Sequence, residues 1–195
     1  MASSAAEPKY QAAASSHIPV DLFISKKHPG LARGDLGFAD SSGNIVFRAI
    51  RHASSGSQKS SDHSKRLVLD AFGNPLFSIC RTHKGSWQAF KGADDEEKDS
   101  VFRVQRTLNK FMRTELEAFL VGENIGVPTS DLKVKGFPFK RSCTIYTGNS
   151  IVAQTSLMYK LHQIFVGRSK FRLTIFPESV DHALIVALIV IFLDA

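Results

Sequence analysis

The feature that most limits the possible folds is an unbroken apolar run, residues 183–193, which contains eleven residues (ALIVALIVIFL). A membrane-spanning helix needs about 20 apolar residues, whereas runs of about 10–14 more often form buried helices. Because Ala-Leu-Ile-Val occurs twice in succession, identical side chains lie at i and i+4 of a helix, and the run is longer than a usual strand. We therefore expect a helix over about residues 180–193, capped at its start by Ser179 or Asp181.

This helix has no polar side, so it must be surrounded on every side. At about 1.5 Å per residue it is about 20 Å long, which matches strands of about six residues at about 3.3 Å per residue. Strands can enclose such a helix only by curling around it. The helix side chains that we expect to fill the core are Leu184, Ile185, Leu188, Ile189 and Phe192.

The rest of the chain is typical of antiparallel strands. From Val20 onward, short runs of alternating apolar and polar residues are separated by turn residues, most clearly at 20–24, 66–70, 101–104, 132–135 and 171–176. About twelve strand candidates precede the apolar run, and a barrel of that size is too wide to fill with its own side chains. The sequence therefore predicts a mainly β fold, a closed antiparallel barrel of about 12 strands around a central C-terminal hydrophobic α-helix.

A short repeat predicts tight hairpins. The segment 40–47 (DSSGNIVF) recurs as 70–77 (DAFGNPLF), and residues 148–152 repeat its second half. In such turns Asp bonds the turn backbone while Gly or Asn accepts a positive φ. None of these glycines belongs to a Gly-x-Gly-x-x-Gly or Walker-type loop, so we interpret them as turn residues rather than phosphate ligands.

Three polar segments lie outside the strand pattern. We interpret the Ala- and Ser-rich residues 1–17 as a flexible tail, with a plastid transit peptide as the alternative, and residues 18–195 as a single domain. The serine-rich insert 51–65 and the acidic insert 92–99 predict surface loops through which protein partners can bind. With 25 Lys and Arg against 18 Asp and Glu, the net charge of +7 attracts anionic surfaces but gives no specific signal for nucleic acid.

The sequence offers no converging set of catalytic residues. It has neither a Gly-x-Ser-x-Gly elbow nor a His-Glu-x-x-His motif, so we expect no enzyme activity and no cofactor. Cys80 and His83 have half of a zinc-type spacing, but Cys143 has no nearby ligand to complete a metal site. Both cysteines are expected to be inert thiols in strands.

Anion binding is the better candidate for a function. Lys133 and Lys135 alternate, which puts both side chains on one face of a strand, and Lys140 and Arg141 follow the turn at 136–139. These four residues form a predicted site for a lipid head group, with Phe137 and Phe139 entering the membrane interface. A second basic stretch contains Lys160, Arg168, Lys170 and Arg172. The alternative is that both sets of residues belong to the solvated surface of a barrel.

An ordered set of motifs resembles the plant LURP-one-related family. The motifs are residues 66–75, 87–92, 102–104, 132–136, 141–146 and 181–191. This family is similar to the tubby C-terminal domain and to phospholipid scramblases, which implies a twelve-stranded barrel around a C-terminal hydrophobic helix. The resemblance also implies a role in plant defence, through lipid-linked or membrane-tethered signalling or through transcription.

Two functions remain open at this point. The first is a non-catalytic, tubby-like module that binds anionic phospholipid or phosphoinositide head groups in membrane-tethered defence signalling. The second is a protein-interaction or transcription-linked scaffold with no lipid ligand. Scramblase-like transport ranks third, because the one long apolar segment is needed inside the barrel. We expect a cytoplasmic monomer, peripheral at the plasma membrane or nuclear, with no membrane span and no secretory signal.

Overall fold

The computed structural model describes residues 18–52, 65–93, 100–110, 112–121, 130–157, 170–177 and 180–195. These residues form twelve strands, one short 3-10 helix, η2 (Pro138–Lys140), and one α-helix, α1 (His182–Asp194). The strands are β1 (Val20–Ser25), β2 (Leu36–Ala39), β3 (Ile45–His52), β4 (Lys65–Asp70), β5 (Pro75–His83), β6 (Ser86–Lys91), β7 (Ser100–Lys110), β8 (Arg113–Leu120), β9 (Leu132–Phe137), β10 (Ser142–Thr147), β11 (Ser150–Leu157) and β12 (Lys170–Ile175).

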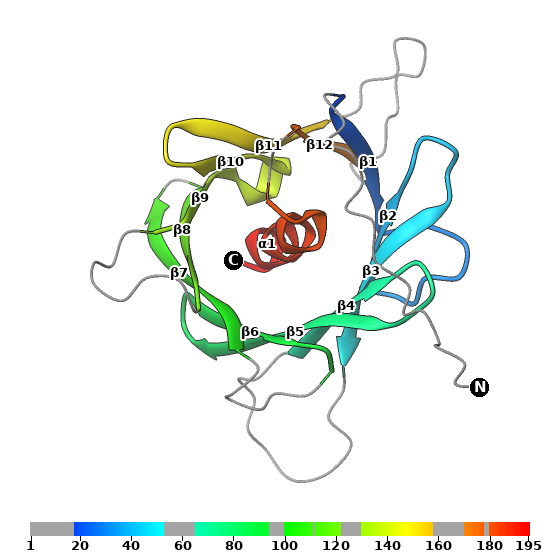
Figure 1. Cartoon of the computed structure of the whole chain (residues 1–195), viewed down its shortest axis with the longest axis horizontal. Helices are drawn as coiled ribbons and strands as arrows, with labels where there is room; N and C mark the ends of the chain where they lie inside the picture. The colour runs from blue at the N-terminus through cyan, green and yellow to red at the C-terminus, as the bar shows by residue number, and fades with distance from the viewer. Residues whose placement is uncertain are drawn as a thin grey trace, which may run out of the picture.

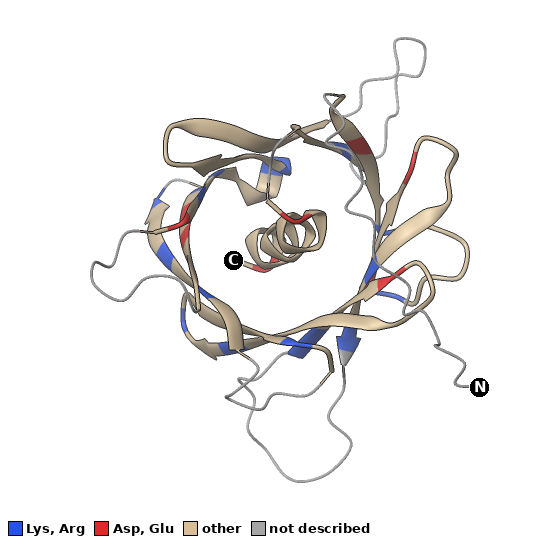
Figure 2. Ribbon diagram, in the orientation of Figure 1, with Lys and Arg blue, Asp and Glu red and all other residues tan. Residues whose placement is uncertain are grey.

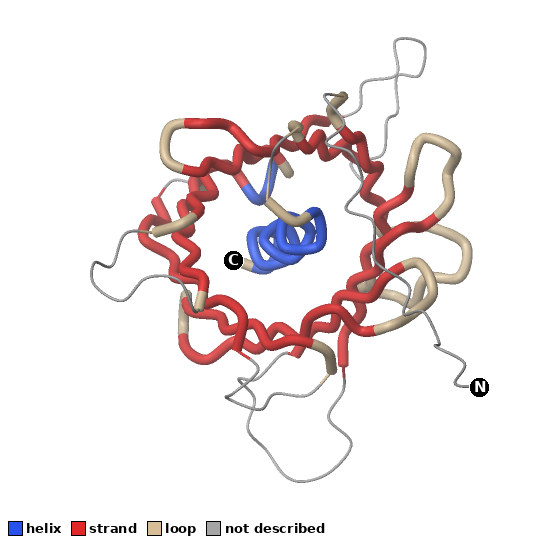
Figure 3. Tube along the Cα trace, viewed as in Figure 1, coloured by secondary structure: helices blue, strands red, loops and turns tan. Residues whose placement is uncertain are grey.

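The twelve strands form one closed antiparallel barrel, in which each strand pairs with its neighbours in the sequence (Figure 1). β1 and β12 close the ring, with Val20 opposite Ile175 and Ser25 opposite Lys170. Closure leaves no unpaired strand edge. Figure 3 shows the strands as a ring around α1, which confirms the fold predicted from the sequence.

The central helix is buried along nearly its whole length. Every residue from Ala183 to Phe192 is buried, including the five side chains expected in the core. The helix starts two residues later than residue 180 because Asp181 is its N-cap, with the carboxylate accepting a hydrogen bond from the Ala183 amide at 2.9 Å. Ser179, the other predicted cap, lies outside the described residues.

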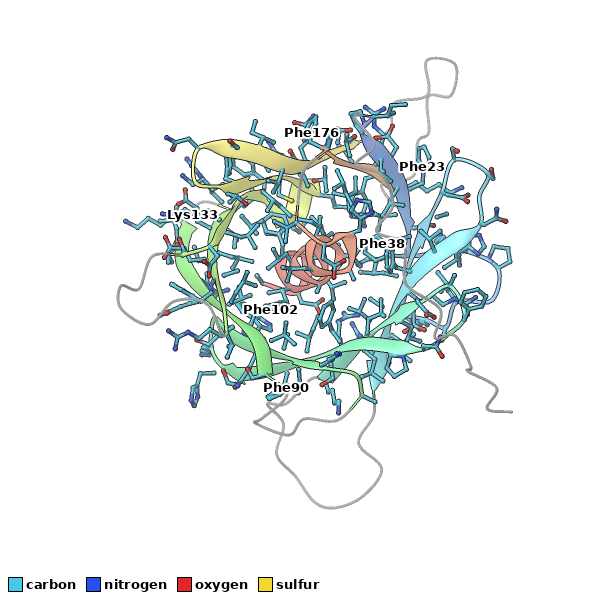
Figure 4. The ribbon with its side chains drawn as sticks, viewed as in Figure 1. Phe23, Phe38, Phe90, Phe102, Lys133 and Phe176 are labelled. Atoms are coloured by element: carbon cyan, nitrogen blue, oxygen red, sulfur yellow. The ribbon has the colours of Figure 1, made fainter. Side chains whose placement is uncertain are left out.

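Large side chains from the strands fill the space between the wall and the helix. Phe38, Phe102 and Phe171 are at most 1% exposed and belong to the same hydrophobic cluster as α1. Figure 4 shows Phe38 and Phe102 between the strands and the helix. The core is therefore a single layer of side chains arranged around α1.

The repeated turns have the predicted geometry. Asp40 accepts hydrogen bonds from the amides of Ser42 and Asn44, and Asp70 accepts them from the amides of Phe72 and Asn74. The third central position of each turn is a glycine with a φ near 90°. Both glycines are turn residues, as predicted.

Other predictions differ from the structure or lie outside it. β7 extends to Lys110, six residues beyond the predicted 101–104, because its polar second half pairs with β8 as far as Arg113. The tail 1–17, Lys160, Arg168 and most of both polar inserts lie outside the described residues. Within the described ranges, no helix has the length and apolar character needed to cross a membrane.

Candidate functional site

A ring of basic residues lines the end of the barrel at which α1 ends, which we call the mouth. Side chains alternate between the two faces of a strand, so a residue two positions from a core residue points to the same side. At the mouth, six basic residues stand two positions from the buried residues Ile24, Ala49, Val68, Ile79, Val104 and Cys143. These six, which we call the basic ring, are Lys26, Arg51, Arg66, Arg81, Arg106 and Arg141. Figure 2 shows basic positions on segments around the whole barrel.

Two members of the basic ring hold the end of the helix. Arg66, which is 7% exposed, forms an ion pair with Asp194, with 2.8 Å between Nη2 and Oδ1. Arg106 donates a hydrogen bond from Nη1 to the Ala195 carbonyl oxygen at 2.8 Å. The last carbonyl groups of a helix lack intrahelical partners and carry its negative dipole end, so these two arginines have a structural role.

Two more members of the ring stack on buried aromatic side chains. The Arg81 guanidinium lies 5.6 Å from the centre of the Trp87 ring, and the Arg141 guanidinium lies 5.7 Å from that of Phe171. Such cation–π contacts fix a cation against the wall of the barrel without removing its charge.

The mouth carries more positive than negative charge. Arg51 and Arg66 stand directly opposite each other on β3 and β4, an arrangement of like charges that destabilises a sheet. Partial burial and then the charge of Arg141 lower the pKa of Lys26, and Arg66 and Arg51 act in the same direction, while Asp194 opposes them. Three arginines and one carboxylate thus act on Lys26, and a positive field of this kind attracts anions.

A pocket of about 830 Å³ opens at the mouth, beside the end of α1. Its lining combines basic and apolar side chains: Lys26, Met112, Pro138, Phe139, Lys140, Arg141, Leu157 and Leu193. Pockets for small ligands have volumes of about 300–1,000 Å³ and mostly apolar walls with a few placed polar groups. This pocket, which we call the mouth pocket, fits that description.

Two residues of the mouth pocket have a strained backbone. Met112, with a φ of 67°, and Arg141, with a φ of 52°, are the two non-glycine residues with left-handed backbone angles in the described part of the chain. The Arg141 amide donates to the Pro138 carbonyl oxygen at 3.0 Å and so closes the η2 turn. Strained residues of this kind cluster at ligand sites, and both of them line the mouth pocket.

The structure divides the four basic residues of the predicted head-group site into two pairs. Lys133 and Lys135 share the outer face of β9, and Figure 4 shows Lys133 pointing away from the barrel. Lys133 forms an ion pair with Glu117 at 3.2 Å, and the Lys135 ammonium lies 5.9 Å from the Tyr146 ring centre. Both lysines are exposed on the outer wall of the barrel, and Lys133 is paired with an acidic residue.

The second pair lies at the mouth. Lys140 and Arg141 both line the mouth pocket, where they meet Lys26. Phe139 is 76% exposed and Phe137 is 38% exposed, with the Lys140 ammonium 5.5 Å from the Phe137 ring centre. The pocket is therefore bordered by exposed apolar side chains as well as by cations.

The sequence analysis missed the other five members of the basic ring, Lys26, Arg51, Arg66, Arg81 and Arg106. The signal that marks them is a basic residue placed two positions beyond the last core residue of a strand. This signal can be used only when it is known which residues of each strand point into the barrel.

The described residues contain no cluster of three or more His, Cys, Asp or Glu side chains that could hold a metal ion.

Cys143 is buried, as predicted, and burial raises the pKa of its thiol to about 12, so the thiol stays protonated at neutral pH. The Thr155 hydroxyl accepts a hydrogen bond from the Cys143 amide at 2.8 Å. Cys80 is half-buried. The thiol of Cys143 is therefore unsuited to nucleophilic chemistry.

Comparison with known proteins supports the motif-based assignment. A family model described as LURP-one-related matches residues 20–194. The chain belongs to the LURP-one-related family. Protein LURP-one-related 7 of Arabidopsis thaliana is 57% identical over 177 residues, which cover 91% of this chain and 90% of the relative. Protein LURP-one-related 15 of the same plant is 32% identical and covers 96% of this chain and 83% of its own length.

A solved structure extends this agreement to the fold. An X-ray structure of a protein from Arabidopsis thaliana superposes with a TM-score of 0.64 at 30% sequence identity. The match covers 91% of each chain. The family predicted from the ordered motifs is therefore confirmed, and the barrel around a central helix has a counterpart among solved structures.

Proposed function

We propose that this LURP-one-related protein is a non-catalytic module that binds anionic phospholipid surfaces, phosphoinositides in particular, through the mouth of its barrel. The observation that carries the proposal is the mouth pocket, where Lys26, Lys140 and Arg141 surround a hollow bordered by the exposed side chains of Phe139 and Met112. In the setting that the family suggests, this binding serves membrane-tethered defence signalling at the plasma membrane.

The physical argument combines charge and apolar contact. Each basic residue close to an anionic leaflet contributes about 1 kcal/mol to binding. Phe139 and Met112 are 76% and 63% exposed, so both are free to enter the boundary between head groups and acyl chains. The barrel then stands end-on, with its mouth against the membrane and the wall pair Lys133 and Lys135 away from it.

Flotation of the full chain on vesicles tests the proposal. Recovery is compared between vesicles of phosphatidylcholine alone and the same vesicles with phosphatidylinositol bisphosphate, at low and at high salt. We expect recovery with the anionic vesicles only, and less of it at high salt because salt screens exposed charges. Equal recovery with both kinds of vesicle at low salt would contradict the proposal.

A pair of charge-matched double variants tests the end-on orientation. Lys26→Ala with Lys140→Ala removes two mouth charges, and we expect about thirtyfold weaker binding, since two residues at about 1 kcal/mol each amount to that factor. Lys133→Ala with Lys135→Ala removes two wall charges and should weaken binding by less than about threefold. Equal losses in both variants contradict binding through the mouth.

We also propose a second candidate, a protein-interaction or transcription-linked scaffold with no lipid ligand. It is favoured by Phe72, which is 92% exposed on the turn that Asp70 stabilises, at the end of the barrel opposite the mouth. A rigid, exposed aromatic side chain is typical of an anchor at a protein interface. The test is deletion of residues 52–64 and, separately, Phe72→Ser. Loss of specific partners without a lower melting temperature supports the scaffold, and unchanged partners contradict it.

A further inference from the structure

We propose that the mouth pocket also binds one single-chain anionic amphiphile as a discrete ligand, with its acidic head group at Lys26 and Arg141 and its acyl chain along Leu157 and Leu193. This inference rests on the proposed binding of anionic lipid and deepens it, because it assigns the mouth pocket a ligand that enters the protein. The shared chemistry is an acid group on one acyl chain, whether a fatty acid carboxylate or the phosphate of a lysophospholipid.

The apolar part of the mouth pocket leads to this ligand. Leu157 at the end of β11 and Leu193 at the end of α1 are half-buried and pack against the core cluster. If only the head group of a bilayer lipid entered the pocket, its polar oxygens would lie against these leucines. They would lose hydration there without gaining a hydrogen-bond partner. An acyl chain suits the same surface, because burial of its methylene groups is favourable.

The basic part of the pocket lies beside this apolar floor. Arg141 is half-buried, and its guanidinium lies on the Phe171 ring. The charges of both Arg141 and Asp194 act on the pKa of Lys26. An acid group bound here places a negative charge beside Lys26 and Arg141, which lowers the repulsion between them. A neutral head group brings no such gain, so the pocket selects for an anion.

The outer lip of the pocket is suited to admit a flexible chain. Met112 and Phe139 are both exposed, and methionine side chains adapt their shape to irregular apolar ligands. Met112 and Arg141 are also the two strained positions of the described chain. Strain at one residue of the lip and one residue of the head-group site is expected if the pocket is shaped for a bound ligand.

Titration calorimetry of the full chain without vesicles tests the inference, with probes kept below their critical micelle concentrations. The probes are laurate, octanoate, lysophosphatidate, the neutral detergent decyl glucoside, and inositol trisphosphate, which has charge but no chain. We expect one-to-one binding of laurate and lysophosphatidate, with about fourfold weaker binding for each methylene lost from laurate to octanoate. Decyl glucoside and inositol trisphosphate should each bind at least about tenfold more weakly than lysophosphatidate.

Two variants on the same strand separate the pocket from the rest of the surface. Laurate binding and vesicle flotation are both measured on each variant. Leu157→Gln should weaken the binding of laurate at least about tenfold. The matched control is Ile151→Gln, at the opposite end of β11, where the side chain is 46% exposed, and it should leave both measurements unchanged. The melting temperature of each variant verifies that it is folded.

The outcomes distinguish this inference from the proposed function. Flotation on phosphoinositide vesicles without binding of laurate or lysophosphatidate overturns the inference and leaves the proposed function intact. Binding of both amphiphiles without flotation supports the ligand site and overturns membrane docking. Tighter binding of laurate identifies a fatty acid, and tighter binding of lysophosphatidate a lysophospholipid, and both results support the inference. Affinity that does not change with chain length overturns it.

Discussion

The burial of α1 inside the barrel leads to a specific prediction about stability. Leu188 lies in the middle of α1, is 0% exposed and is surrounded by the wall of the barrel. Truncation of a fully buried leucine to alanine costs its transfer free energy and leaves a cavity, in total about 2–5 kcal/mol. Because the closed wall restricts collapse around the cavity, we expect Leu188→Ala to fall in the upper half of this range.

The assay is thermal unfolding together with urea denaturation. In a domain of this size each 1 kcal/mol lowers the melting temperature by about 2–4 °C, so Leu188→Ala should lower it by about 7–20 °C. The urea midpoint should fall with an unchanged slope, which indicates a change in stability rather than in the surface exposed on unfolding. Ile151→Ala, at a site that is 46% exposed, is the control and should shift stability by less than about 0.5 kcal/mol. A melting temperature of Leu188→Ala within about 2 °C of the wild type would refute the view that α1 is the core.

Three further predictions concern the wall of the barrel. Gly136→Ala should cost about 1–3 kcal/mol in urea unfolding, because its Cβ would lie 2.2 Å from the Ser142 carbonyl oxygen and 2.5 Å from the Cys143 Cα, both backbone atoms. With its pKa raised to about 12 by burial, the Cys143 thiol should resist a thiol-specific reagent at pH near 8 in the native protein and react after unfolding, so fast native labelling of Cys143 contradicts its burial. Hydrogen bonds from the Asn74 side-chain amide and from turn backbone N–H groups lower the pKa of Asp70, so its contribution to stability is complete above pH about 4 and is lost as the pH falls through the lowered value. Unfolding free energies of Asp70→Asn and the wild type should therefore converge in acid, and a difference that is constant with pH contradicts this.

Much of the fold is encoded locally, which is why it could be predicted from the sequence. The apolar run 183–193 excludes a solvent-exposed face on the helix, and the alternation in the preceding segments indicates strands. The length of β7 was underestimated because its second half is mostly polar, with Leu108 as its one apolar residue, and extends through its pairing with β8. Pairing between strands is a non-local property, so no local pattern marks where that strand ends.

The candidate site was predicted only in part, for the same reason. Alternation correctly places Lys133 and Lys135 on one face, but Glu117 reaches Lys133 from the neighbouring strand, which the pattern along β9 does not show. Lys140 and Arg141 are at the mouth because η2 turns inward against the end of α1, with Arg141 in a left-handed conformation. A lone arginine gives no sequence signal for that conformation, whereas a glycine or asparagine would have done so.

Closure of the barrel between β1 and β12 has a consequence for biosynthesis. The first strand, Val20–Ser25, finds its last partner only when Lys170–Ile175 has been made, and the strands have nothing to close around until His182–Asp194 follows. Contacts so distant in sequence slow folding and leave unpaired strands open to aggregation in the meantime. The nascent chain therefore exposes unpaired strands throughout translation, and a polypeptide truncated before the helix codons lacks the side chains that fill the barrel.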